Sequence, residues 1–140
     1  MYTAVLMTHS LLRWLVLASV AARVAIAGQG LATGRETAQP LDRRGSLVAL
    51  ILADTQMLLG LLLWGVLSPV VSQARSDMGA AMKDGVLRWP LVEHPTMMIL
   101  ALVAVHVGQV MTKRGAKHAS VLGVYGIALL VLLVGSFRHG

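Results

Sequence analysis

Four apolar stretches, each long enough to cross a lipid bilayer, occupy most of this 140-residue chain. A spanning helix needs roughly 20 mainly apolar residues, and the stretches cover residues 4–27, 47–71, 95–111 and 119–137. A mean hydropathy of +0.74 also separates the chain from soluble domains of this size. No alternating pattern typical of barrel strands is present. We therefore predict an all-α integral membrane protein, a single four-helix up-down domain over residues 1–140.

The segment between the second and third stretches has an amphipathic pattern. Its apolar residues recur at roughly helical spacing, and they are Ala74, Met78, Ala81, Met82 and Val86. Charged residues occupy the other positions, and Trp89 follows, a residue type common at headgroup depth. The pattern predicts a short amphipathic helix lying on the membrane surface.

Basic residues in the connecting segments predict the orientation. With four spans, the termini and the 72–93 segment share one side, and the 28–46 and 112–118 segments share the other. The first side carries Arg75, Lys83, Arg88 and Arg138, and the second carries Arg35, Arg43, Arg44, Lys113, Arg114 and Lys117. The positive-inside tendency therefore predicts that the termini lie outside the cytoplasm. No basic patch is interleaved with aromatic residues, so the expected partner is the lipid bilayer and not nucleic acid.

The residue types present exclude several kinds of chemistry. The chain has no cysteine, so disulfides, Cys-ligated iron–sulfur clusters and thiol catalysis are not available to it. It also lacks a Gly-rich phosphate loop, a His-Glu-x-x-His metal motif and a nucleophile with an obvious base. Hydrolytic activity is therefore not expected, while other enzyme activity is left open.

Four ionisable residues gather near the terminal side of the predicted bundle. They are His9 and Arg13 in the first helix, and Glu93 and His94 at the start of the third. Two imidazoles facing each other across a bundle suit the axial ligation of a b-type haem. Arg13 would then pair with a haem propionate or with Glu93. Glu93 or a backbone carbonyl could hydrogen-bond to a ligand histidine and fix its tautomer. The alternative is that the histidines cap helix ends beside an ordinary Arg13–Glu93 ion pair.

A second polar layer lies roughly 18 Å further along the helices. It comprises Arg23, Asp54, His106 and Tyr125 on the first to fourth helices respectively. Asp54 and His106 suit a proton-accepting pair beside Tyr125, at a quinone head or in a proton relay. Arg23 and Gln56 are the further candidates for this proton or quinone site. The alternative is that Asp54 neutralises Arg23 or His106 only to hold the bundle together.

The remaining conspicuous residues are predicted to serve packing or to face water. The small residues expected to let helices approach closely are Gly60, Gly65, Gly123 and Gly126. His118 and His139, in a connecting segment and near the C-terminus, are expected to be solvated and to have no role.

Five segments of the chain carry a resemblance to a known family. They are residues 8–14 (THSLLRW), 56–61 (QMLLGL), 84–89 (DGVLRW), 93–98 (EHPTMM) and 125–130 (YGIALL). Together they resemble a family of small bacterial four-helix membrane proteins described as cytochrome b-like. The resemblance implies a haem-binding electron carrier of the bacterial cytoplasmic membrane. In that membrane, the distribution of basic residues predicts that the termini lie on the periplasmic side. The matching site positions are His9, Arg13, Gln56, Arg88, Glu93 and His94.

The chain departs from this family at Asp54, where members often have a histidine, so the resemblance implies one haem b per chain at most. Electrons would pass between the haem and a quinone or a partner redox protein. Two other functions remain open: a non-catalytic accessory subunit of a respiratory or photosynthetic complex, and a small proton-coupled transporter using Asp54 and His106. Other membrane subunits or a homo-oligomer are the expected protein partners.

Overall fold

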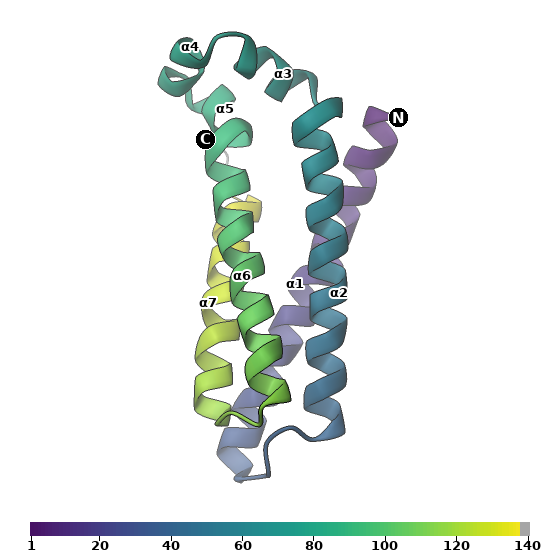
Figure 1. The fold of residues 1–140 in the computed structure, drawn as a ribbon, viewed down its shortest axis with the longest axis vertical. Coiled ribbons are helices and arrows are strands. Elements are labelled where there is room, and N and C mark those ends of the chain that lie inside the picture. The colour runs from purple at the N-terminus through teal and green to yellow at the C-terminus, as the bar shows by residue number, and fades with distance from the viewer. Residues whose placement is uncertain (138–140) are drawn as a thin grey trace.

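The structure, a computed structural model, describes residues 1–137, which form helices and short connections without strands (Figure 1). The long helices are α1 (Tyr2–Thr33), α2 (Pro40–Leu62), α6 (His94–Lys113) and α7 (His118–Phe137). The short segments between α2 and α6 are η1 (Leu63–Leu67), α3 (Pro69–Ser76), α4 (Met78–Lys83), α5 (Gly85–Arg88) and η2 (Trp89–Glu93), of which η1 and η2 are single π-helical turns. The predicted all-α class is confirmed.

Four helical segments are long and apolar enough to cross a membrane. They are Tyr2–Thr33, Pro40–Leu67, Gly85–Lys113 and His118–Phe137, with mean hydropathies of 1.6 to 2.3 in their most apolar windows. The second and third continue through η1 and η2, because a π turn keeps the backbone hydrogen-bonded inside a helix. The segments include the four predicted stretches almost entirely and extend further into their polar flanks.

The four long helices pack in a ring, with α1 and α6 each contacting α2 and α7. As a result, α1 and α6 are diagonal partners. The shared core consists mainly of small and β-branched side chains, and its buried members are Val16, Leu17, Val20, Ala27, Ala49, Ala53, Ala101, Val105, Val121, Tyr125, Ala128 and Leu132. In Figure 1 the N-terminus lies at the same end as α3, α4 and α5, and the short α1–α2 and α6–α7 connections lie at the other.

The segment predicted as one amphipathic helix is divided into α3, α4 and α5. Asp77 and Asp84 cause the breaks, because each has a non-helical backbone and caps the helix that follows. The Asp77 carboxylate accepts a hydrogen bond from Ala80 N at 3.1 Å, and Asp84 accepts one from Val86 N at 3.0 Å. Aspartate is among the residues that favour this N-cap position. The prediction of one continuous helix is therefore wrong.

Close helix approach occurs mostly at glycines other than those predicted. A Cβ atom at Gly108 would lie 2.6 Å from Tyr125 Cζ, and one at Gly30 would lie 2.5 Å from His118 Cε1. At Gly135 it would lie 2.3 Å from Met98 Cε, the end of a flexible side chain. By contrast, a Cβ atom would meet nothing within 4 Å at Gly65, Gly123 or Gly126. The packing role predicted for these three is wrong, since they face away from the neighbouring helices of this chain.

Candidate functional site

The structure brings His9 of α1 and His94 of α6 together across the diagonal of the bundle. Their ring centres are 6.5 Å apart and their planes are nearly perpendicular, at 82°. His94 is the first residue of α6, directly after the π turn η2. The two histidines come from distant parts of the chain, so their approach depends on how the helices pack.

The environment of His94 determines which of its ring nitrogens carries hydrogen. Its Nδ1 atom lies 2.8 Å from the carbonyl oxygen of Gly135 on α7. Because a carbonyl oxygen only accepts, Nδ1 donates and carries the hydrogen in this contact. In a neutral imidazole the other nitrogen, Nε2, then has a free lone pair. An Nδ1–H bond to a carbonyl is the arrangement that orients a histidine as a metal ligand through Nε2.

The neighbours of His9 leave polar atoms without partners. Among the described residues, His9 Nδ1 and Gln56 Oε1 are buried and have no hydrogen-bond partner. The amide Nε2 of Gln56 donates to the backbone oxygen of His9 at 2.7 Å, which ties α2 to α1. Gly60, one of the glycines predicted to allow close helix packing, lies against the His9 ring. A Cβ atom added there would be 3.2 Å from His9 Cε1. Buried polar atoms without partners are uncommon, and they are candidates for contact with a ligand or water.

Two cavities meet at the histidine pair. Their volumes are about 220 and 190 Å³. The larger is mainly apolar and lies among α1, α2 and α6, and the smaller lies towards α7. The residues that line both are His9, Gln56, Pro90, His94 and Met98. Small-molecule and cofactor sites are commonly about 300–1,000 Å³, so each cavity by itself is smaller than a usual cofactor site.

Arg13 is the one predicted charged partner that lines a cavity, the smaller of the two. Its guanidinium lies 5.2 Å from the centre of the Trp14 ring and 5.3 Å from that of Phe137. Its Nε atom is buried without a hydrogen-bond partner among the described residues. These contacts leave its positive charge without a carboxylate partner among residues 1–137.

Glu93 and Arg88, the other predicted site residues, pair with each other instead. Arg88 Nε donates to Glu93 Oε1, and its Nη1 donates to the backbone oxygen of Met82. Neither Arg88 nor Glu93 lines either of the two cavities. The Arg13–Glu93 ion pair considered from the sequence does not form, because Glu93 is already bonded at the end of the short-helix segment.

The donor set agrees with what a b-type haem requires. Two imidazoles that share one metal ion, with metal–nitrogen bonds of roughly 2 Å, have ring centres roughly 6–6.5 Å apart. The 6.5 Å separation of His9 and His94 matches this value. Both rings line the two cavities, and Arg13 places a cation at the smaller one. The residues present therefore fit such a group.

No protein-family model, curated protein or solved structure matches this chain. The resemblance to cytochrome b-like proteins accordingly stays a prediction.

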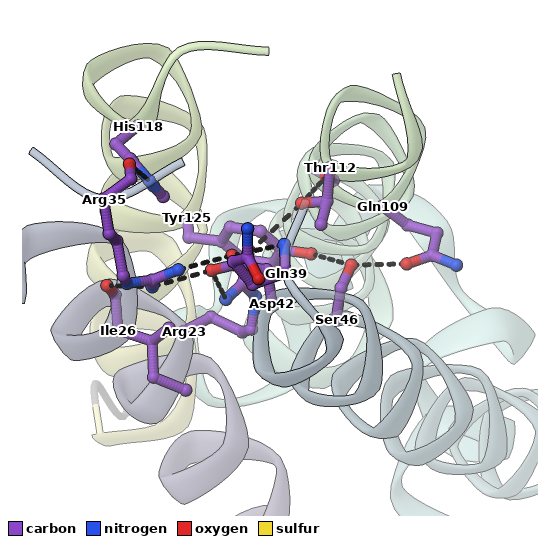
Figure 2. Close-up of polar contacts among 11 residues, drawn as sticks. Arg23, Ile26, Arg35, Gln39, Asp42, Ser46, Gln109, Thr112, His118 and Tyr125 are labelled. Atoms are coloured by element: carbon purple, nitrogen blue, oxygen red, sulfur yellow. Dashed lines mark hydrogen bonds and ion pairs between the residues drawn. The ribbon is translucent and has the colours of Figure 1, made fainter. Parts of the chain in front are cut away.

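The far end of the bundle holds a buried ionic cluster that includes Arg23 (Figure 2). Asp42 of α2 pairs with two arginines: Arg35 donates to both carboxylate oxygens at 2.7 and 2.9 Å, and Arg23 Nη1 lies 3.6 Å from Oδ1. Arg23 is only 1% exposed. The Asp42 hydrogen bonds raise the pKa of Arg35. Sequence reasoning missed Asp42, although an aspartate two residues after Pro40 at a helix start is a recognisable capping signal.

Tyr125 extends this cluster to the other helices. Its hydroxyl lies 2.7 Å from Ser46 Oγ, and Ser46 donates in turn to Gln109 Oε1, so Tyr125 donates to Ser46. Arg23 Nη2 donates to Thr112 Oγ1 at 3.2 Å, and its guanidinium is 5.0 Å from the Tyr125 ring centre. The network links α1, α2, α6 and α7 (Figure 2). Buried side chains bonded mainly to one another in this way hold a bundle together.

Asp54 and His106 form a separate pair on the outside of the bundle. His106 Nε2 lies 2.8 Å from Asp54 Oδ1, and their side chains are 49% and 45% exposed. Neither lines either of the two cavities. The predicted proton or quinone site is therefore divided into three places: Asp54 with His106, Arg23 with Tyr125, and Gln56 beside His9.

His118 is not solvated as predicted. It is buried, with Nε2 3.1 Å from the backbone oxygen of Arg35, and its ring fills the space above Gly30. The prediction failed because the α1–α2 connection folds over the start of α7. His139 lies outside the described residues.

Proposed function

We propose that this protein is a membrane electron carrier that binds one b-type haem between His9 and His94. The observation that carries the proposal is the 6.5 Å separation of two imidazole rings across the bundle, both of which line the two cavities. A haem would supply one-electron transfer by its iron. A quinone or a partner redox protein would exchange electrons with it.

Each nearby residue of the chain has a separate part in this proposal. Gly135 orients His94 by accepting its Nδ1 hydrogen, and Gln56 holds α2 against α1 next to His9. Arg13 provides a positive charge for a propionate and favours the reduced state. The larger cavity has a mainly apolar lining, and apolar surroundings strengthen such electrostatic effects.

The proposal includes an arrangement in the membrane. The four long helices would cross the bacterial cytoplasmic membrane as an up-down bundle, with α3, α4 and α5 at its outer surface. Their position at the same end as the N-terminus supports this placement (Figure 1). The haem would then lie near the periplasmic side, within reach of a partner on that side or of a quinone in the bilayer.

The test is a reduced-minus-oxidised visible spectrum with a pyridine haemochrome assay. It uses detergent-purified protein made with excess haem supply, for the wild type, His9→Ala and His94→Ala. His106→Gln is the matched control, because its imidazole is half exposed on the outer surface and away from both cavities. We expect about one haem per chain in the wild type and the control, and a loss of the bis-histidine spectrum in both site variants.

A wild type that stays colourless with haem in excess would overturn the proposal. It would favour the second function, an accessory subunit of a larger membrane complex that contributes no haem. The transporter alternative receives less support, since Asp54 and His106 lie outside both cavities. It predicts that Asp54→Asn abolishes transport and that His9→Ala does not.

A further inference from the structure

The position of the Asp54–His106 pair is unusual for a helix bundle in a membrane. Asp54 lies ten residues from Arg44 and ten from Trp64, which places it roughly 15 Å from each along a helix. This is the middle of a hydrocarbon core of about 30 Å. Ionisable residues at this depth almost always face the bundle interior or a partner, whereas these side chains are 45% and 49% exposed.

The pair joins the two least buried spans of the bundle. The most apolar 18-residue windows of the α2 and α6 spans are 17% and 22% buried, against 28% for both α1 and α7. Apolar side chains surround the pair on both helices, including Ile51, Leu58, Val103 and Val110, each 46–68% exposed. Such an apolar surface is normal next to lipid, so the polar pair at its centre is the feature that needs explanation.

The Asp54–His106 pair has hydrogen-bonding atoms that it does not use. His106 uses Nε2 and Asp54 uses Oδ1 in their contact, and the structure gives neither side chain another hydrogen bond among the described residues. When His106 carries both ring hydrogens, the pair leaves one donor, Nδ1–H, and one acceptor, Oδ2. Lipid tails offer nothing to either atom.

One donor beside one acceptor is the pattern that a twofold axis satisfies. In a symmetric dimer the same patch meets itself, so residue i contacts j and j contacts i. His106 of each copy would donate to Asp54 of the other, and the two opposite charges would alternate in one cluster. No outside group of matched chemistry and depth is then required.

We propose that the α2–α6 face binds the same face of a second copy of this chain, with the two Asp54–His106 pairs meeting at the dimer axis. Hydrogen bonds between polar side chains contribute to helix association in membranes, where apolar contacts give little advantage because the surrounding lipid is as apolar as leucine. This proposal does not depend on the proposed haem, because His94 lies twelve residues before His106 on α6, roughly 18 Å along the helix.

The experiment uses the absence of cysteine in the full chain. Single cysteines at Ile51, Leu58, Val103 and Val110 are treated with a bismaleimide linker in native membranes. The control is Ile127→Cys, 61% exposed near the middle of α7. We expect linked dimers from the α2–α6 positions and only background linking from Ile127. Equal linking at Ile127, or none at any of the α2–α6 positions, would overturn the proposal.

A second measurement tests the polar pair itself. Asp54→Leu combined with His106→Leu removes both groups from an outward surface, and circular dichroism confirms that the helices are retained. We expect the dimer dissociation constant in lipid vesicles, measured by energy transfer on dilution, to rise roughly tenfold or more. A variant that exchanges the two residues, Asp54→His with His106→Asp, should dimerise more tightly than the double leucine variant. A wild type that is monomeric, a double variant that dimerises as well as the wild type, or an unlike subunit covering this face would contradict it.

Discussion

The Nδ1 atom of His94 lies 2.8 Å from the backbone oxygen of Gly135, and this contact joins the start of α6 to the last turn of α7. It has two consequences. It ties the two helices together where the cavities lie, and it leaves the Nε2 lone pair of a neutral His94 unprotonated. The structural role of His94 and its proposed ligand role thus involve different nitrogen atoms.

Two conservative variants separate these roles. Asparagine places its amide nitrogen near the position of Nδ1, so His94→Asn keeps a donor for Gly135 and loses the distal nitrogen. Glutamine reaches further and loses the Gly135 bond. We expect His94→Gln to lower the free energy of unfolding in detergent by about 1 kcal/mol and His94→Asn by less. The bis-histidine haem spectrum should be absent from both variants, and its retention in His94→Asn would contradict the proposed ligation.

A second prediction concerns the positive charge of Arg13. It lines the smaller cavity and has no carboxylate partner among residues 1–137. Arg13→Gln should therefore lower the midpoint potential of the bound haem by tens of millivolts, since about 1 kcal/mol corresponds to about 40 mV for a one-electron couple. Lys83→Gln, at an exposed position in α4, is the control in the same redox titration. A potential that shifts equally in both variants would argue against a local effect.

A third prediction tests the ionic cluster at the loop end. Asp42→Asn leaves Arg23, which is 1% exposed, and Arg35 without their carboxylate. Removal of one partner from a buried ion pair commonly costs about 3–5 kcal/mol, because the remaining charge stays buried. We expect an equivalent loss of unfolding free energy, measured by denaturant titration in mixed micelles. The control is Glu36→Gln, at an exposed position in the connection between α1 and α2. It should change the free energy of unfolding by less than about 0.5 kcal/mol.

A fourth prediction compares two glycines. At Gly108 an added Cβ would lie 2.6 Å from Cζ of the fully buried Tyr125 ring, which is held by Ser46 and cannot move aside cheaply. Gly108→Ala should therefore destabilise the protein by about 1–3 kcal/mol. At Gly123 the added Cβ meets nothing within 4 Å, so Gly123→Ala should be neutral or stabilising by up to about 1 kcal/mol. Thermal unfolding followed by circular dichroism compares the two, and similar melting temperatures would show that α6 and α7 are further apart than described.

The fold class could be predicted from the sequence alone. Four long apolar stretches permit few arrangements other than four helices, because every backbone polar group must be satisfied in lipid. Helical rise also placed His9 and His94 at one depth and Arg23 and Tyr125 at another, since depth needs only residue number and helix direction. Within the short-helix segment the pattern failed at Asp77 and Asp84, where local capping competed with helical continuity.

What the tertiary structure decided is which side of each helix faces inward. Depth alone grouped Asp54 and His106 with Arg23 and Tyr125, but rotation about the helix axes places the first two outside and the others inside. Likewise, the carboxylate that serves Arg23 comes from Asp42, twelve residues before the predicted Asp54. Apolar and polar residues are only weakly separated around these helices, because lipid and core are both apolar. Sequence periodicity therefore gives little information on how each helix is rotated about its axis. Side-chain packing among α1, α2, α6 and α7 supplies it.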